Sequence, residues 1–262
     1  MSIPSHSSCY FFKFGLLVTG KGEEKYLPQL FRSLEATGIC SFEVIRKIEQ
    51  LSPTNPPDRS RTDNRRVVGS PKNIPRKDVE RISLPARRYI QSSPCNYVLL
   101  IDDLEGRHRD IAEQVFNRYR EALDALLSSE RERASVHFLA NMLEAYYFAD
   151  TQAINSVLGT SLQEYEGDVE TISSPKGELK QILKQSSRRF REVEDGGKII
   201  QELDMTRILG NPETCAALRT LFAWCLKILK QYPDSNNLNL NDLEKLYHIE
   251  DGKLYEITAS QL

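Results

Sequence analysis

The sequence predicts an α/β fold with a mostly parallel central sheet flanked by helices and a mainly helical C-terminal portion. Three observations lead to this prediction. The chain opens with a strand, a glycine turn, a helix and a second strand, which is the order of a βαβ unit. Residues 97–101 (YVLLI) form a continuous apolar run, typical of a strand buried on both faces of a sheet. After residue 160 the pattern is mainly helical.

The elements of the first half follow from local patterns. Residues 11–19 (FFKFGLLVT) are apolar and β-rich, and an apolar stripe at helical spacing then runs from Glu23 to Gly38, a good C-terminal cap. The same reasoning predicts further strands at 42–48 and 135–139 and helices at 78–91, 110–133, 144–150 and 153–158.

In the second half, Ser174-Pro175 supplies an N-cap and a first-turn proline for a helix over 175–186. Two alternating runs around Asp251-Gly252 predict a β-hairpin near the end of the sequence. We therefore expect an α/β domain over residues 10–160 and a helical C-terminal portion over 161–262 that ends in a short hairpin. The other predicted helices lie near 196–204, 206–210 and 212–231.

Composition narrows the class of protein. The 262 residues carry a formal net charge of −2, which excludes a histone-like charge balance and an acidic disordered chain. There is no 18-residue apolar run and no secretory signal, so we expect a cytoplasmic protein without a membrane partner. The five cysteines include no C-x-x-C pair, and we expect reduced thiols that serve mostly as small core residues.

Residues 53–88 are rich in proline, and basic residues outnumber acidic ones there. The part up to about residue 77 is predicted to be a long mobile loop. Its cations are candidates for weak contact with nucleic-acid phosphates, although no aromatic residue is present for base stacking and a solvated loop is the alternative. The candidate nucleic-acid-binding residues are Arg59, Arg61, Arg65, Arg66 and Lys72.

Acidic residues follow two of the predicted strands. Glu23 comes after the first strand, and Asp103 and Glu105 come after the third, where the Asp-x-Glu spacing gives both side chains the same orientation. Ligands bind at the carboxyl ends of parallel strands, and gathered carboxylates suit Mg²⁺ or Mn²⁺. The alternative is that Glu23 only favours a helix N-terminus and that Asp103 only ends a strand.

Other candidates are less specific. Glu144 lies in an apolar run, and it either faces water, pairs with an arginine, or points inward as a ligand or base. His108 follows Glu105 closely and is a candidate ligand or acid, whereas His137 alternates with apolar residues and is expected to be a packed or a surface imidazole rather than a base. Gly20-Lys21-Gly22 does not match a P-loop.

Three segments, LLVTGKGEEKYLPQLF, YVLLIDDLEG and VHFLANMLEAYYFAD, together resemble a bacterial family of TOPRIM-like proteins. This family is the domain of unknown function numbered 4276, often met near phage-defence genes. Later pieces (SPKGELKQIL and GGKIIQELDMTRIL) are also similar, so the resemblance covers most of residues 13–230. It implies Mg²⁺-dependent phosphoryl transfer on nucleic acid, because TOPRIM domains carry a glutamate after the first strand and an Asp-x-Asp after a later one.

The resemblance also assigns positions. The V-E-G-x-x-E pattern of the family falls on residues 18–23, with Thr19 in place of the first glutamate and Glu23 at the second. Its Asp-x-Asp falls on Asp103-Leu104-Glu105, and the glutamate and aspartate of its E-A-W-L-L-A-D string fall on Glu144 and Asp150. The implied metal ligands are Glu23, Asp103 and Glu105.

The departure at Thr19 leaves two functions open. A threonine hydroxyl does not titrate near neutral pH, so a neighbouring carboxylate, with Glu23 and Glu144 as the catalytic candidates, has to replace the missing glutamate. The chain is then a Mg²⁺-dependent phosphodiesterase or nuclease of a bacterial defence or DNA-processing system. Otherwise it is a non-catalytic module that binds nucleotide, nucleic acid or a partner protein, or an inert scaffold in a defence complex.

Overall fold

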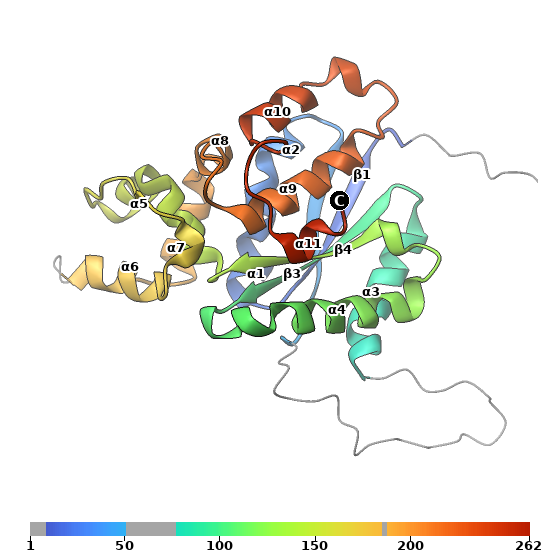
Figure 1. The fold of residues 1–262 in the computed structure, drawn as a ribbon, viewed down its shortest axis with the longest axis horizontal. Helices are drawn as coiled ribbons and strands as arrows, with labels where there is room; N and C mark the ends of the chain where they lie inside the picture. The colour runs from blue at the N-terminus through green and yellow to red at the C-terminus, as the bar shows by residue number, and fades with distance from the viewer. Residues whose placement is uncertain (1–8, 51–76, 185–187) are drawn as a thin grey trace, which may run out of the picture.

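The computed structural model describes residues 9–50, 77–184 and 188–262, and shows an α/β fold around a parallel sheet (Figure 1). The strands are β1 (Phe12–Val18), β2 (Cys40–Lys47), β3 (Asn96–Leu104) and β4 (Ala134–Ala140). Their order is β2-β1-β3-β4, and every neighbouring pair is parallel. The predicted fold class is therefore confirmed, and β1 and β3 occupy the middle of the sheet.

Helices cover both faces of the sheet. One face packs on α3 (Lys77–Ser92) and α4 (Ala112–Leu127). The other face packs on α1 (Lys21–Tyr26), α2 (Arg32–Glu35) and α9 (Ala216–Leu229), as the layers in Figure 1 show. Alternate residues of β3 enter the two cores, and this explains the uninterrupted apolar run of that strand.

The predicted helices form in part: the one that starts at Glu23 is divided, the one over 110–133 is shortened to α4 with 3₁₀ turns on either side, and the one over 144–150 is a 3₁₀ helix. Pro28 opens a 3₁₀ turn, η1 (Leu27–Phe31), between α1 and α2, and the 144–158 region divides into a 3₁₀ helix and α5. The remaining elements are η3 (Gly106–Ile111), η4 (Arg131–Arg133), η5 (Leu143–Asp150), α5 (Thr151–Leu158), η6 (Val169–Thr171), α6 (Pro175–Lys184), α7 (Glu194–Glu202), α8 (Met205–Leu209), η7 (Ser235–Asn237), α10 (Leu240–Leu246) and α11 (Glu256–Ala259).

Asp150, at the end of the Glu-Ala-aromatic string, has a structural role. Its buried carboxylate caps α5 by accepting from the Ala153 amide. It also accepts from the Asp204 amide at 2.9 Å and from the Arg207 guanidinium at 2.8 Å. Asp150 therefore ties α5 to the start of α8.

The predicted terminal hairpin is wrong. Residues 247–255 form turns and irregular backbone between α10 (Leu240–Leu246) and α11, without a strand. The cause is the buried Arg219 of α9, whose guanidinium donates to the carbonyls of Tyr247 and Lys253 and so holds this segment against the helix. The backbone carbonyls that would pair across a hairpin are used here by a side chain.

The turn after α11, at the C-terminal end of the described residues, also covers one edge of the sheet. The Gln261 side chain accepts from the Val136 amide at 2.9 Å and donates to the Val136 carbonyl at 2.7 Å. This imitates a neighbouring strand at the outer edge of β4, where unpaired groups invite association.

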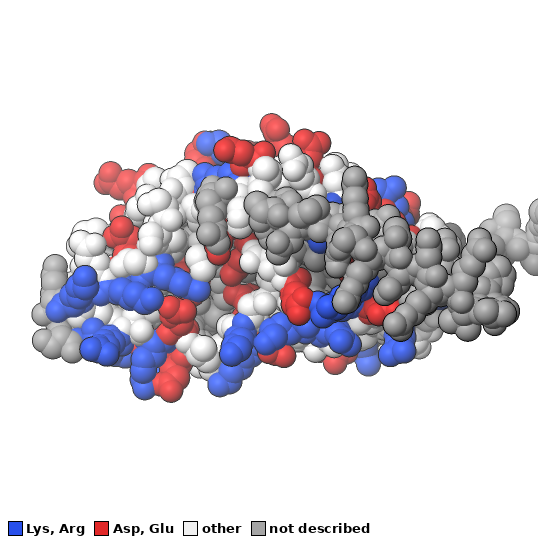
Figure 2. All heavy atoms as spheres, turned by 90° about the horizontal axis from the view of Figure 1, so that it is seen from below, with Lys and Arg blue, Asp and Glu red and all other residues white. Residues whose placement is uncertain are grey.

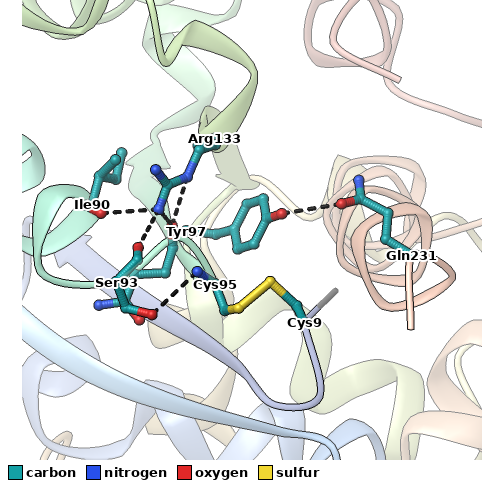
Figure 3. Close-up of a disulfide and its surroundings, with 8 residues drawn as sticks. Cys9, Ile90, Ser93, Cys95, Tyr97, Arg133 and Gln231 are labelled. Carbon is teal, nitrogen blue, oxygen red and sulfur yellow. Dashed lines mark hydrogen bonds between the residues drawn. A yellow bond between two sulfur atoms is a disulfide. The ribbon is translucent and has the colours of Figure 1, made fainter. Parts of the chain in front are cut away.

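The expectation that all cysteines are reduced is also wrong, because Cys9 and Cys95 form a disulfide (Figure 3). The pairing arises because the Lys13 amide donates to the Cys95 carbonyl, which places the start of β1 beside the turn that precedes β3. On the other side of that turn, Arg133 donates to the carbonyls of Ser93 and Ile90. Cys40, Cys215 and Cys225 are free and buried, as small core residues are expected to be.

We expect Cys9→Ser to lower the free energy of unfolding by about 2–4 kcal/mol, because the disulfide joins residues 86 positions apart and restricts the unfolded chain. Urea denaturation of the oxidised protein and the variant measures the difference. Reductant should bring the wild-type curve onto that of the variant and leave the variant unchanged. Coincident curves without reductant would show that the disulfide adds no stability.

None of the helices in the described segments has the length and apolar character needed to cross a lipid bilayer.

Candidate functional site

The carboxyl edge of the sheet brings three acidic residues together. Glu23 lies in the first turn of α1 after β1, Asp103 lies near the end of β3, and Glu144 lies in η5 after β4. Burial raises the pKa of Asp103 well above its ordinary value, and the neighbouring charges of Glu23 and Glu144 raise it further. These three carboxylates form the acidic cluster, which lies where ligands bind in parallel α/β folds.

Each carboxylate of the acidic cluster has an oxygen atom with no hydrogen-bond partner among the described residues. These buried atoms are Glu23 Oε2, Asp103 Oδ1 and Glu144 Oε2. Burying a carboxylate oxygen without a donor is costly, and three carboxylates together increase the cost. The cluster therefore calls for protons or a bound cation.

The positively charged side chain of one lysine already contacts this cluster. Lys176 in the first turn of α6 places its Nζ 3.4 Å from Glu144 Oε1 and 3.7 Å from a Glu192 oxygen. Burial lowers the pKa of Lys176, but the charges of Glu144, Glu192 and Asp103 outweigh this effect, and the net pKa is raised. Burial raises the pKa of Glu144, and Lys176 only partly opposes the rise. Glu144 thus points inward and pairs with a lysine rather than with an arginine.

Gly20 and Tyr147 also lie at the acidic cluster. A Cβ atom on Gly20 would lie 1.6 Å from Glu23 Oε2, so only glycine lets the Glu23 carboxylate fold back over the turn after β1. Tyr147 of η5 is buried, and its pKa is raised well above the ordinary value by burial and by the charges of Glu144, Glu23 and Asp103. Its phenol therefore remains a neutral hydrogen-bond donor beside the carboxylates.

Asp102 faces the other side of β3. Its Oδ1 accepts from the Thr19 hydroxyl at 2.7 Å and its Oδ2 accepts from the Tyr119 hydroxyl at 2.8 Å. Burial raises the pKa of Asp102 to about 6, although these two hydrogen bonds oppose the rise. Thr19, the position at which the sequence resemblance predicts a glutamate, therefore links β1 to β3 behind the cluster.

The raised pKa of Asp102 predicts a loss of stability with rising pH. Since the folded pKa of about 6 exceeds the ordinary 3.8, the folded chain holds this proton more tightly. The contribution is complete below pH 3.8 and is lost as the pH rises through about 6, and it amounts to about 3 kcal/mol. Asp102→Asn should flatten the pH dependence of urea denaturation in this range, because asparagine does not titrate.

The matched control for that measurement is Asp110→Asn, which changes an exposed carboxyl nearby in the chain. It should leave the slope of stability against pH as it is in the wild type. A slope that Asp102→Asn does not change would show that Asp102 titrates normally in the folded protein.

The turn after β4 is strained. Asn141 and Met142 have positive φ angles of 55° and 77°. The Asn141 amide donates to the Leu104 carbonyl at the end of β3, which holds the turn against the sheet edge. Asparagine adopts this region readily, whereas a methionine at φ 77° and ψ 163° occupies a conformation that almost only glycine adopts. The strained turn starts η5 and so aims Glu144 at the cluster.

Glu105 lies beside the cluster rather than among the main charges that act on Asp103. It lines a pocket of about 490 Å³ that also includes Lys176. The described residues that line it are Glu105, Arg109, Asn141, Met142, Thr171, Ser173, Ser174, Pro175 and Lys176.

The donor set fits a divalent cation in kind, because the unpartnered atoms are hard carboxylate oxygens. Within residues 9–50, 77–184 and 188–262, however, no three His, Cys, Asp or Glu side chains are arranged to hold a metal ion. Metal binding therefore requires the carboxylates of the acidic cluster to draw together.

The structure gives different outcomes for the basic loop residues and the two candidate histidines. The nucleic-acid-binding candidates Arg59, Arg61, Arg65, Arg66 and Lys72 lie outside the described residues. His137 is buried, has its Nε2 3.0 Å from the Ser135 hydroxyl, and has a pKa lowered to about 3 by burial, which confirms a packed imidazole. His108 is half-buried in η3, and nothing places it against the acidic cluster.

Sequence reasoning missed Lys176 and Tyr147. Tyr147 lies in the same aromatic segment as Glu144, and this segment was the sequence feature that could have identified it. Lys176 follows a helix N-cap far along the chain, and only the folding of α6 against η5 brings it to Glu144.

Comparison with known proteins gives one match. A family model described as "Domain of unknown function (DUF4276)" matches residues 18–223, a range that contains the whole acidic cluster and the pocket. No curated protein and no solved structure matches the chain significantly.

Proposed function

Since the chain belongs to the DUF4276 family, whose description assigns no activity, we propose from its site that it is a Mg²⁺- or Mn²⁺-dependent nucleic-acid phosphodiesterase. The observation that carries the proposal is the set of three buried, unpartnered carboxylate oxygens at the carboxyl edge of a parallel sheet. The parallel α/β fold and the relation to TOPRIM proteins suggested by the sequence support it. The proposal extends to a role in bacterial defence or DNA processing, with a protein partner from the same system.

Glu23, Asp103 and Glu144 would hold the metal, with Glu105 at the rim. A bound Mg²⁺ would lower the pKa of a water molecule and stabilise negative charge on a phosphate. Lys176 offers a positive charge to a phosphate once a cation takes over the Glu144 carboxylate.

A specific observation favours the non-catalytic alternative, a module that binds nucleotide, nucleic acid or a partner protein. Thr19 replaces the expected glutamate, and its hydroxyl is committed to Asp102. The absence of a preformed metal cluster among the described residues agrees with this alternative.

The test is cleavage of single-stranded, duplex and nicked DNA and of RNA with Mg²⁺, Mn²⁺ or EDTA. We expect cleavage only with a divalent cation, and a loss of at least about 100-fold in Glu23→Gln. The matched control is Glu24→Gln, because Glu24 is exposed and pairs with Lys47 at 3.5 Å. It should keep full activity.

The two functions give different results. Metal-independent binding of nucleic acid without cleavage would establish the non-catalytic module. Absence of both cleavage and calorimetric Mn²⁺ binding would reject the phosphodiesterase.

A further inference from the structure

The pocket beside the acidic cluster is built from three separate segments. Glu105 and Arg109 follow β3, Asn141 and Met142 follow β4, and residues 171–176 lead from η6 into α6. Its volume of about 490 Å³ lies within the range of about 300–1,000 Å³ that is typical of small-molecule sites. Lys176 belongs to both the pocket and the Glu144 ion pair, so a ligand in the pocket lies next to the acidic cluster.

The lining suits an oxyanion on one side. Arg109 and Lys176 outnumber the single carboxylate of Glu105, and the hydroxyls of Ser173 and Ser174 stand at the start of α6. Figure 2 shows Lys and Arg side chains gathered at its left, where α6 lies. Arginine and lysine beside hydroxyl donors are the usual protein groups that bind phosphate.

A second observation points to a ligand with donor groups as well. Asn141 is 3% exposed, and its Nδ2 donates to the carbonyls of Glu170 and Ile172, both at 2.8 Å. These two bonds fix the side-chain amide, yet its Oδ1 is buried without a partner among the described residues. A buried acceptor that is held in place and unused is available to a donor, and a hydroxyl or an amino group of a ligand is such a donor.

Among the described residues that line the pocket there is no aromatic side chain, and Met142 and Pro175 are the main apolar ones. A base would therefore find no surface for stacking there. A ligand that offers a phosphate to the cations and hydroxyl or amino groups to Asn141 and Glu105 satisfies both sides of the pocket.

We propose that this pocket binds one nucleotide unit, with Arg109 and Lys176 on its phosphate and Asn141 accepting a hydrogen bond from its sugar or base. The proposal rests on the proposed function in taking nucleic acid as the substrate. It adds that the chain recognises the sugar and phosphate of a nucleotide next to the phosphate that is cut, and that this recognition requires no metal.

The test is isothermal titration calorimetry in EDTA with adenosine 5′-monophosphate, uridine 5′-monophosphate and inorganic phosphate. We expect both mononucleotides to bind at least about tenfold more tightly than phosphate. Arg109→Gln should weaken both by at least about tenfold, the effect of losing a charge-assisted hydrogen bond. The matched control is Arg88→Gln, because Arg88 is exposed near the end of α3, which leads to the amino end of β3 and away from the pocket.

Three results would overturn this proposal: no mononucleotide binding by the wild type, equal affinity for phosphate and mononucleotides, or equal weakening by Arg88→Gln and Arg109→Gln. Asp103→Asn separates it from the proposed function. This variant should keep mononucleotide affinity in EDTA within about threefold while it loses metal-dependent cleavage. Mononucleotide binding by a protein that cleaves nothing would reject the phosphodiesterase and retain the pocket.

Discussion

Asp103→Asn is expected to make the folded protein more stable and to abolish metal-dependent cleavage. Asp103 lies among the charges of Glu23, Glu144 and Asp102, and the charge of Lys176 opposes them. Asparagine has nearly the same shape and removes one of the repelling buried charges, which is worth about 1–3 kcal/mol. The same change removes a central carboxylate of the acidic cluster, which is one of the proposed Mg²⁺ ligands.

Urea denaturation at neutral pH in EDTA measures the first effect, and the midpoint should move to higher urea. Mn²⁺ measures the second effect, because a ligand that binds only the folded protein raises its melting temperature. We expect Mn²⁺ to stabilise the wild type and not the variant. The exposed Asp110→Asn should change neither quantity. A destabilised Asp103→Asn protein would mean that the Asp103 carboxylate supports the fold.

The second large effect is expected for Arg219→Met, which should lower the free energy of unfolding by about 4 kcal/mol or more. Arg219 is 0% exposed. Its guanidinium donates to six backbone carbonyls, which belong to Leu209, Asn211, Pro212, Thr214, Tyr247 and Lys253. Methionine fills much of the volume but donates none of these hydrogen bonds.

Chemical denaturation measures the loss of unfolding free energy, and amide hydrogen exchange shows which segment is destabilised. Amides of residues 247–253 should lose protection in the variant, because Arg219 holds this segment against α9. Lys230→Met is the matched control on the same helix, since Lys230 is exposed and pairs with Glu244 at the surface. It should cost less than about 1 kcal/mol. Equal losses in both variants would show that the buried guanidinium has no special role.

The sheet was predictable because its signals are local. The run YVLLI at 97–101 is buried on both faces in β3, as its continuous apolar character indicated. The helix ends were less predictable, since Pro28 breaks one helix into a 3₁₀ turn and Asp150 starts another. The hairpin prediction failed because a buried arginine, remote in sequence, takes the carbonyls that strands would use.

The candidate site was also predictable only in part. Glu23 and Asp103 were predictable, because parallel strands end at the same edge and both residues follow such strands. The contact of Lys176 with Glu144 and the disulfide between Cys9 and Cys95 join distant segments, and no local pattern encodes them. Charge repulsion in the cluster is also a property of the folded chain alone, since in the unfolded chain water separates these carboxylates.

Met142 has a consequence for how this protein can evolve. Its backbone occupies a conformation in which glycine costs almost nothing and methionine costs about 1–3 kcal/mol. Selection for stability alone would favour glycine at this position. The Met142 side chain lines the pocket, so if the pocket binds a ligand as proposed, selection for binding and selection for stability oppose each other at this residue. Laboratory evolution for heat resistance, without selection for binding, should find this position early.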